Sequence, residues 1–179
     1  MSLLKEKYAK EVVGAFKKEF GIANVFQVPR IGKVVLNVGL GSGVKDDKFH
    51  DSVKNSLRRI TGQEPLKTLA KKSISNFKIR EGQVVGMKVT LRGKRMYDFL
   101  DKLVHVAMPR IRDFRGISAK SVDSTGNLHL GFKEHVSFPE IKTDEIERIH
   151  GLEISITTNA KDHDKGYALF KYLGFPFAK

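Results

Sequence analysis

The chain has 179 residues, 40% of them hydrophobic and 30% charged, so it can bury one sizeable core and has the composition of a folded protein. Lysine and arginine number 33 against 20 acidic residues. The resulting net charge of +13 points to a polyanionic partner, either nucleic acid or an anionic membrane surface. Because the chain contains no cysteine, disulfides, thiolate metal sites and cysteine nucleophiles are excluded.

Signals for export and membrane insertion are missing from the sequence. No run reaches the roughly 18 consecutive apolar residues that a spanning helix needs. The first residues, MSLLKEKYAKEVV, lack the apolar core and cleavage site of a signal peptide. A membrane-surface protein would carry its charge on an amphipathic helix, whereas much of it here falls on predicted loop and strand. We therefore predict a cytoplasmic protein that does not act at a membrane.

The first third of the chain predicts two helices and a strand. In residues 3–20 an apolar side chain recurs at every fourth position, which predicts an amphipathic helix ending at Gly21. The β-branched run KVVLNV, residues 33–38, predicts a buried strand. Asp47 is the expected N-cap of a second helix that stops at Gly62.

The middle of the chain predicts a long loop, a strand and a helix. After the extended piece PLKTLA, residues 71–83 (KKSISNFKIREGQ) show neither a helical nor an alternating pattern and predict a loop. Apolar and polar residues alternate over 85–91, the period of a strand with one buried face. A third helix is predicted over about 95–108, closing before Pro109.

The last third predicts two more strands and two helices. Alternation predicts strands at 128–132 and 152–156. Between them a short capped helix is expected to begin near Thr143. A final helix is predicted over about 164–173, ending at Gly174.

Every predicted strand has one apolar face and every predicted helix one apolar stripe. The economical arrangement is an α+β fold of two layers, a largely antiparallel sheet with helices packed on one face. We find no linker of domain-boundary composition and predict a single domain over 1–179. The opposite face of the sheet is then expected to present polar and basic side chains, those of Lys33, Asn37, Lys88, Thr90 and Arg92.

Positive charge is concentrated in the first two thirds of the chain. Residues 54–95 contain twelve basic residues against two acidic ones, whereas 134–165 contain four basic residues against eight acidic ones. A single surface lysine usually means only a solvated side chain. Solvation alone does not readily explain a cluster of this size, because like charges repel one another. The free energy of that repulsion is most easily offset when the cluster binds phosphates and releases their counterions.

Motifs for catalysis or metal binding are weak. The glycines of residues 39–43 follow a strand, as in phosphate-binding loops, but their spacing fits neither a dinucleotide fingerprint nor a P-loop. Asp46 and Asp47 also place negative charge where the phosphate would bind. A turn that lets the backbone approach RNA is the better interpretation. The six histidines lack ligand spacing, and residues 162–164 (Asp-His-Asp) are more simply helix-capping residues. We predict no enzyme, no cofactor, no metal site and no small-molecule substrate.

Several long stretches resemble one known family, in order and over nearly the whole chain. They are QVPRIGKVVLNVGLG, TGQEPLKTLAKKSISNFKIREGQVVGMKVTLRGKRMYDFLDKL, MPRIRDFRGISAKS, FPEI and LGFPFAK. They are similar to the bacterial large-subunit ribosomal protein uL5 family, whose members bind 5S ribosomal RNA. The resemblance implies a non-catalytic α/β domain related to RNA-recognition folds, located in the central protuberance of the large subunit beside large-subunit rRNA.

The resemblance also implies three sets of contact residues. In the family the sheet face and adjoining loops meet 5S rRNA, which corresponds here to Asn37, Gly39, Gly41, Gln63, Lys88, Thr90 and Arg92. The family's long loop approaches the P-site transfer RNA, which corresponds to Lys71, Lys72, Ser73, Asn76, Phe77, Lys78 and Arg80. An arginine-rich stretch touches a small-subunit head protein across an intersubunit bridge, which corresponds to Arg110, Arg112, Phe114 and Arg115.

Alternatives remain open within these assignments. Phe77 could stack on a base or tether the loop to its own domain, and the arginine-rich stretch could form local salt bridges with Asp113. Residues 122–128 depart from the family, whose members commonly carry aromatic-Asp-Gly-Arg-Gly-Asn-Tyr there, so the resemblance assigns no contact residue to that turn. For the whole chain the competing functions are a free-standing regulatory RNA-binding protein and a nucleic-acid-processing enzyme.

Overall fold

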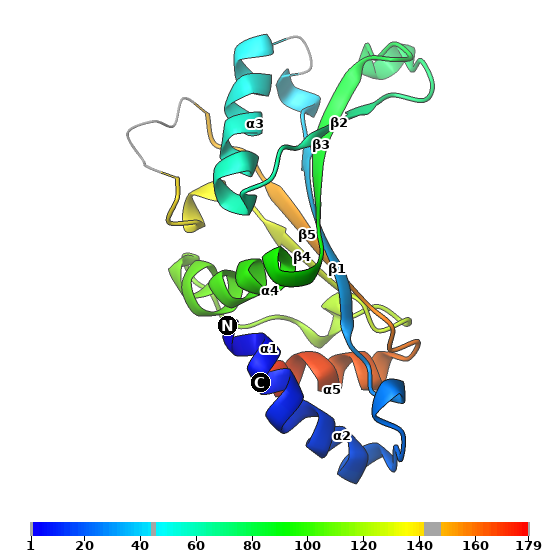
Figure 1. Ribbon diagram of the computed structural model, residues 1–179. Helices are drawn as coiled ribbons and strands as arrows, with labels where there is room; N and C mark the ends of the chain where they lie inside the picture. The colour runs from blue at the N-terminus through cyan, green and yellow to red at the C-terminus, as the bar shows by residue number, and fades with distance from the viewer. Residues whose placement is uncertain (1, 44–45, 142–147, 179) are drawn as a thin grey trace. The chain divides into compact units, whose positions relative to one another are not determined.

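The computed structural model describes residues 2–43, 46–141 and 148–178 (Figure 1). By its internal contacts the chain divides into two compact units. Unit 1 comprises Met1–Val34, Leu91–Leu130 and Ser155–Lys179, and unit 2 comprises Val35–Thr90 and Gly131–Ile154. Each unit draws on segments far apart in sequence, and the single domain over 1–179 stays a prediction.

Five strands form one antiparallel sheet with helices packed on it, which confirms the predicted α+β class. The order across the sheet is β2-β3-β1-β5-β4. The strands are β1 (Ile31–Gly39), β2 (Leu66–Leu69), β3 (Val84–Leu91), β4 (Leu128–Phe132) and β5 (Leu152–Thr158). Strand β2 lies at one edge and pairs with β3 in a register that places Leu66 opposite Lys88 and Thr68 opposite Gly86.

The predicted strand periodicity is confirmed by burial. In β1 the side chains of Val34, Leu36 and Val38 are buried, while the residues between them are partly exposed. Strands β3 and β5 alternate in the same way, with Met87, Val89 and Leu91 buried in β3 and Leu152, Ile154 and Ile156 buried in β5. Alternation of this kind lets one face of a sheet contribute to the core while the other stays polar.

Helices of unit 1 largely follow the predictions. The stretch 3–20 is helical throughout, as α1 (Leu3–Lys7), a π-helical turn (Tyr8–Val12) and α2 (Val13–Phe20), and Gly21 ends it with φ of 64°. Helix α5 (His163–Leu173) is capped by Asp162, whose carboxylate accepts from the Asp164 amide, and it ends at Gly174. The predicted capping role of 162–164 is thus confirmed.

Helix α4 (Gly93–Lys102) begins two residues earlier than predicted. It continues through a π-helical turn (Leu103–Ala107) into a 3-10 turn (Met108–Arg110) that contains Pro109. The prediction that the helix closes before Pro109 was therefore too short. The last turn is a tighter 3-10 turn with proline near its start. Proline is tolerated there because an amide proton at that position would have no helical acceptor.

Unit 2 contains α3 (Asp47–Thr61), which ends at Gly62 as predicted. Its N-cap is Asp46 and not Asp47, since the Asp46 carboxylate accepts from the Phe49 amide at 3.2 Å. Adjacent aspartates make the two positions hard to separate by sequence. The helix expected near Thr143 falls on residues outside the described ranges.

Residues 70–83 connect β2 to β3 and form the tip of a hairpin. The predicted loop is folded back on itself, with reciprocal backbone hydrogen bonds between Ile74 and Ile79. A 3-10 turn (Ser75–Phe77) closes it, and Lys78 follows with φ of 54°. Ser73 accepts from the Glu81 amide at 2.9 Å and so fixes the two sides of the loop. We call residues 66–91, β2, loop and β3 together, the arm.

Candidate nucleic-acid interface

The outward face of the sheet in unit 2 carries three of the five polar side chains predicted there, those of Asn37, Lys88 and Thr90. Lys33, half-buried in β1, belongs to unit 1. In β3 Lys88 is exposed and Thr90 is half-buried, and both point away from the core that holds Met87, Val89 and Leu91. Asn37 of β1 is half-buried on its outward side. Arg92 follows Thr90 along the chain, is exposed and belongs to unit 1.

Gln63 is positioned by the end of α3. Its backbone amide donates to the Thr61 hydroxyl at 3.2 Å, and its side-chain Nε2 donates to the Thr90 carbonyl at 3.3 Å. The structure therefore brings two of the predicted contact residues, Gln63 and Thr90, into direct contact. Gly39 ends β1 and Gly41 begins a 3-10 turn, and both are exposed, so a ligand can approach the backbone there.

Glu153 is the residue of this face that sequence reasoning left out of the site. It lies in β5, is exposed, and its Oε2 atom accepts from Nδ2 of Asn37 at 3.5 Å. The alternation of β5 had indicated an outward side chain, but the pairing of β1 with β5 could not be known from sequence. A carboxylate here repels a phosphate, which favours contact between Asn37 and a base or ribose.

The basic side chains of the arm face solvent without a compensating acid among the described residues. The nearby ion pairs are made by residues that precede the arm in the chain: Glu64 pairs with Lys54 at 2.7 Å and lies 3.8 Å from Arg58, and the hydrogen bond from Lys54 lowers the pKa of the Glu64 carboxyl. Within the described ranges no ion pair engages the arm's own basic side chains, Lys67, Lys71, Lys72, Lys78, Arg80 and Lys88. Their charge is thus available to a polyanion.

Phe77 stands at the tip of the arm and is 72% exposed. Tethering of the loop to its own domain by this ring, one of the two interpretations above, is therefore wrong. An exposed aromatic ring among lysines is typical of a stacking platform for a base. Along the same arm the side chains of Leu66, Leu69 and Ile74 are also exposed.

The arginine-rich stretch of unit 1 is also open to solvent. Arg110, Arg112 and Arg115 are exposed, and Phe114 is half-buried. Asp113 adopts a left-handed backbone conformation with φ of 54°. In the part of the chain that the structure describes, Asp113 forms no salt bridge with these arginines, so the local ion pairs considered above are not formed.

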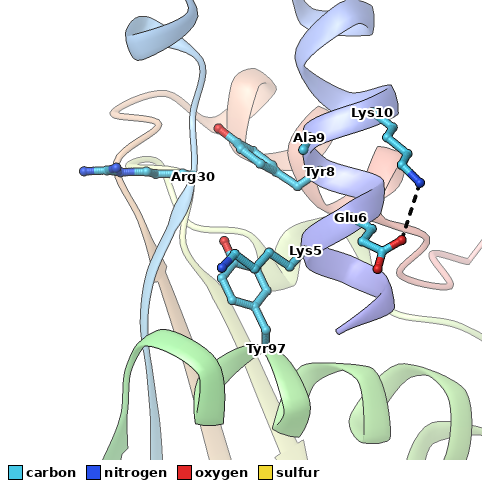
Figure 2. A pocket seen from close by; sticks show the side chains of 7 residues that line it. All are labelled: Lys5, Glu6, Tyr8, Ala9, Lys10, Arg30 and Tyr97. Atoms are coloured by element: carbon cyan, nitrogen blue, oxygen red, sulfur yellow. Dashed lines mark hydrogen bonds and ion pairs between the residues drawn. The ribbon is translucent and has the colours of Figure 1, made fainter. Parts of the chain in front are cut away.

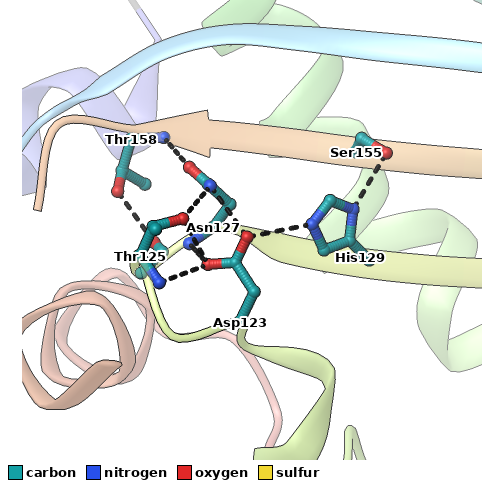
Figure 3. A network of polar contacts seen from close by, with 7 residues as sticks. Asp123, Thr125, Asn127, His129, Ser155 and Thr158 are labelled. Carbon is teal, nitrogen blue, oxygen red and sulfur yellow. Dashed lines mark hydrogen bonds and ion pairs between the residues drawn. The ribbon is translucent and has the colours of Figure 1, made fainter. Parts of the chain in front are cut away.

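The atypical turn 122–128 is held by a polar network (Figure 3). The Asp123 carboxylate accepts from the Thr125 and Asn127 amides at 2.9 and 2.8 Å, and from the side chains of both residues. Asn127 in turn accepts from the Thr158 amide of β5 at 2.9 Å. Burial raises the pKa of Asp123, but the hydrogen bonds from Asn127, Thr125 and His129 together hold it well below its ordinary value.

His129 links this turn to β5. Its Nδ1 lies 3.0 Å from the Ser155 hydroxyl and its Nε2 3.4 Å from the Asp123 carboxylate. Serine, histidine and aspartate in this order also occur in hydrolases. Sequence reasoning missed the arrangement because 26 residues separate His129 from Ser155. Asp123 has further partners in Thr125 and Asn127, so its carboxylate mainly organises the turn.

Neither a membrane span nor a metal cluster occurs among the described residues. There, no helix has both the length and the apolar composition to cross a membrane. The same residues contain no group of three or more histidine, aspartate or glutamate side chains placed to hold a metal ion.

Comparison with known proteins identifies the family. The family model described as "Ribosomal protein L5" matches residues 24–80, and that for the C-terminus of the same family matches 84–177. The large ribosomal subunit protein uL5 of Francisella philomiragia is 55% identical over 177 residues, 99% of each chain. The protein of the same name from Francisella tularensis subsp. novicida is 54% identical over the same length. The chain belongs to the ribosomal protein uL5 family.

Membership in the uL5 family establishes the class of function. The chain is a structural constituent of the large ribosomal subunit, associated with ribosomal RNA in the cytoplasm. It is not an enzyme. The contact of His129 with Ser155 and Asp123 is accordingly a structural one.

Proposed function

We propose that this uL5 chain binds 5S rRNA and helps to attach it in the central protuberance. The observation that carries the proposal is the outward pair Lys88 and Thr90 of β3, which combines positive charge with a hydrogen-bonding group, and exposed Arg92 follows two residues later in the chain. Lysine and arginine supply the salt-dependent attraction to phosphates, while Asn37, Gln63 and Thr90 can hydrogen-bond bases or riboses. Gly39 and Gly41 leave the backbone open to the same RNA.

We further propose that the tip of the arm contacts the P-site transfer RNA and that the arginine-rich stretch contacts a small-subunit head protein. Exposure of Phe77 and the uncompensated lysines around it support the first contact. Exposure of Arg110, Arg112 and Arg115 supports the second, since guanidinium groups bind carboxylates and phosphates in a fixed fork geometry.

The proposal is tested by RNA affinity as a function of salt. The natural chain should bind 5S rRNA more tightly than an unrelated stem-loop of equal length at physiological ionic strength. Arg92→Ala should weaken 5S rRNA binding and reduce the slope of log affinity against log salt by about one unit, because one phosphate contact is lost.

Lys133→Ala provides the matched control. Lys133 is exposed, lies outside the proposed contact residues and carries the same charge, so its removal should leave the salt slope nearly unchanged. Equal losses of slope in both variants would show a general effect of net charge and would remove Arg92 from the interface. Equal affinity for the two RNAs would contradict the proposed function itself.

A further inference from the structure

A pocket in unit 1 has no part in the contacts proposed so far. Its volume is about 620 Å³, and it opens between the helical stretch 3–20, the chain entering β1, and α4 (Figure 2). Pockets that hold small organic ligands commonly measure 300–1,000 Å³. The residues that line it are Lys5, Glu6, Tyr8, Ala9, Lys10, Arg30 and Tyr97.

Two tyrosines from different elements give the pocket its aromatic walls. Tyr8 comes from the π-helical turn and Tyr97 from α4, and both rings extend into the space in front of the chain that carries Arg30 (Figure 2). Asp101, one helical turn beyond Tyr97, accepts from the Leu4 amide at 2.9 Å and from the Ser2 hydroxyl at 2.5 Å. This cap fixes the first helix against α4, so the relative placement of the two rings is built into the fold.

Positive charge surrounds these rings. Glu6 is paired with Lys10 at 3.5 Å. Arg30 and Lys5 are exposed, and among the described residues no ion pair engages either of them. The Arg30 backbone is anchored independently of its side chain, because its amide donates to Oδ1 of Asn159 at 2.6 Å.

The phenol groups are kept in their protonated form. Burial raises the pKa of Tyr8 and of Tyr97, and the nearby Arg30 guanidinium opposes this only in part. The Tyr8 hydroxyl contacts the Val28 carbonyl at 3.5 Å, a long distance that leaves room for a better acceptor. The pocket therefore combines two aromatic faces, hydroxyl donors and unpaired cations.

We propose that this pocket binds one unstacked nucleotide of ribosomal RNA, with the base against Tyr8 or Tyr97 and its phosphate near Arg30 and Lys5. Every base has a π-face, so stacking on tyrosine accepts bases in general, and cations at the rim fit the phosphate. A purely apolar ligand would leave these cations without a partner. The inference rests on the proposed function only in taking RNA as the ligand.

Tyrosine fluorescence gives a local readout of the pocket. The chain has four tyrosines and no tryptophan. Tyr167 packs on Phe177, and Tyr172 donates to Glu19. All four tyrosines lie in unit 1, but only Tyr8 and Tyr97 line the pocket. Quenching on titration with hexauridylate therefore reports binding close to a tyrosine, and a smaller quench in Tyr97→Leu assigns that binding to this pocket.

The full chain should bind hexauridylate at least about fivefold more tightly than an abasic ribose-phosphate hexamer, with quenching, because one stacked base is lost. Tyr97→Leu should abolish most of this preference, and Tyr97→Phe, which keeps the ring, should retain it. Arg30→Glu should weaken hexauridylate binding and lower its salt slope by about 0.7 or more. Lys18→Glu, the same charge change on the exposed side of α2, should change the slope much less.

Four results would overturn the inference. Three are equal binding of the two hexamers, equal effects of Arg30→Glu and Lys18→Glu, and equally strong quenching by free uridine monophosphate, which would mark a free-nucleotide site. The fourth is displacement of hexauridylate by a carboxylate-rich peptide while RNA binding elsewhere persists, which would assign the pocket to a protein partner. If the pocket variants show no effect but Arg92→Ala still weakens 5S rRNA binding, only the pocket proposal is wrong. If the chain shows no preference for 5S rRNA but the pocket variants behave as expected, only the proposed function is wrong.

Discussion

Asp123 shows how a single residue can hold a turn. The turn 122–128 contains Asp123, Gly126 and Asn127. Those three residues build the turn. Asp123 and Asn127 supply the hydrogen bonds, and Gly126 has φ of 81° with no room for a Cβ atom, which would lie 2.6 Å from the Asp162 carbonyl.

Asp123→Ala should lower the free energy of unfolding by about 2 kcal/mol, because several amide and hydroxyl donors lose a charged acceptor that is only partly exposed. Chemical denaturation measures the loss. Asp98→Ala is the control, since Asp98 is an exposed carboxylate of α4 and its removal should cost less than about 0.5 kcal/mol. Similar losses in the two variants would show that the turn network contributes little.

At the scale of the elements, the arm combines a rigid base with an exposed tip. The β2–β3 pairing and the hydrogen bonds between Ile74 and Ile79 fix its backbone. The ring of Phe77 adds almost nothing to the core of unit 2, because 72% of it is exposed. An exposed ring at a basic tip points to binding more than to stability.

Phe77→Ala should therefore leave the free energy of unfolding within about 0.5 kcal/mol of the natural value. It should weaken P-site transfer RNA binding by ribosomes that carry the variant, by about 1–3 kcal/mol if the ring stacks on a base. Filter binding of labelled transfer RNA measures the second effect. Leu69→Ala, at a side chain 56% exposed lower on the arm, should leave that binding unchanged. A destabilised protein with normal transfer RNA binding would assign Phe77 to folding instead.

Elements with a clear apolar period could be predicted, and contacts between distant segments could not. The alternation in β1 and β3 predicted both the strands and the residues on their outward faces, and Gly21, Gly62 and Gly174 predicted where helices end. The hairpin tip was missed because Ile74 and Ile79 pair across a turn without any alternating pattern. Site components set by strand order, such as Glu153 beside Asn37, need the sheet before they can be seen.

The tyrosine pocket illustrates the same limit. Tyr8 had been counted only as one member of an apolar stripe, and nothing in the sequence near Tyr97 indicates that the two rings meet. Their arrangement depends on the Asp101 cap of the first helix, a contact across 97 residues. Local pattern therefore predicts which side chains face a core, while tertiary contacts decide which of them form a site.

For the molecule as a whole, the buried histidines of unit 2 set a limit on acid stability. His135 and His150 are 2% and 6% exposed, and their rings stack with centroids 3.8 Å apart. Nδ1 of His135 lies 3.3 Å from both the amide nitrogen and the carbonyl oxygen of His150, so it accepts from the amide in one tautomer and donates to the carbonyl in the other. Burial lowers the pKa of both, and His135 further lowers the pKa of His150, to about 4.

Above a pH of about 6.5 both histidines are neutral in the folded and the unfolded chain, so they do not make the free energy of unfolding depend on pH. Between 6.5 and about 4 the unfolded chain takes up protons that the folded chain does not. The free energy of unfolding therefore falls, by about 3 kcal/mol for His150 alone, and levels off below that range. Hydrogen exchange of the Leu152 and Ile154 amides as a function of pH measures this loss within unit 2.

His150→Phe should flatten the acid limb of that curve, because an aromatic ring can still stack on His135 and takes up no proton. His163→Gln should not. Asp164 raises the pKa of His163 by a side-chain hydrogen bond, so this exposed histidine stabilises the fold at low pH and its removal can only steepen the loss. An acid limb that is unchanged in His150→Phe would show that carboxylates such as Asp123, and not the stacked histidines, control acid unfolding.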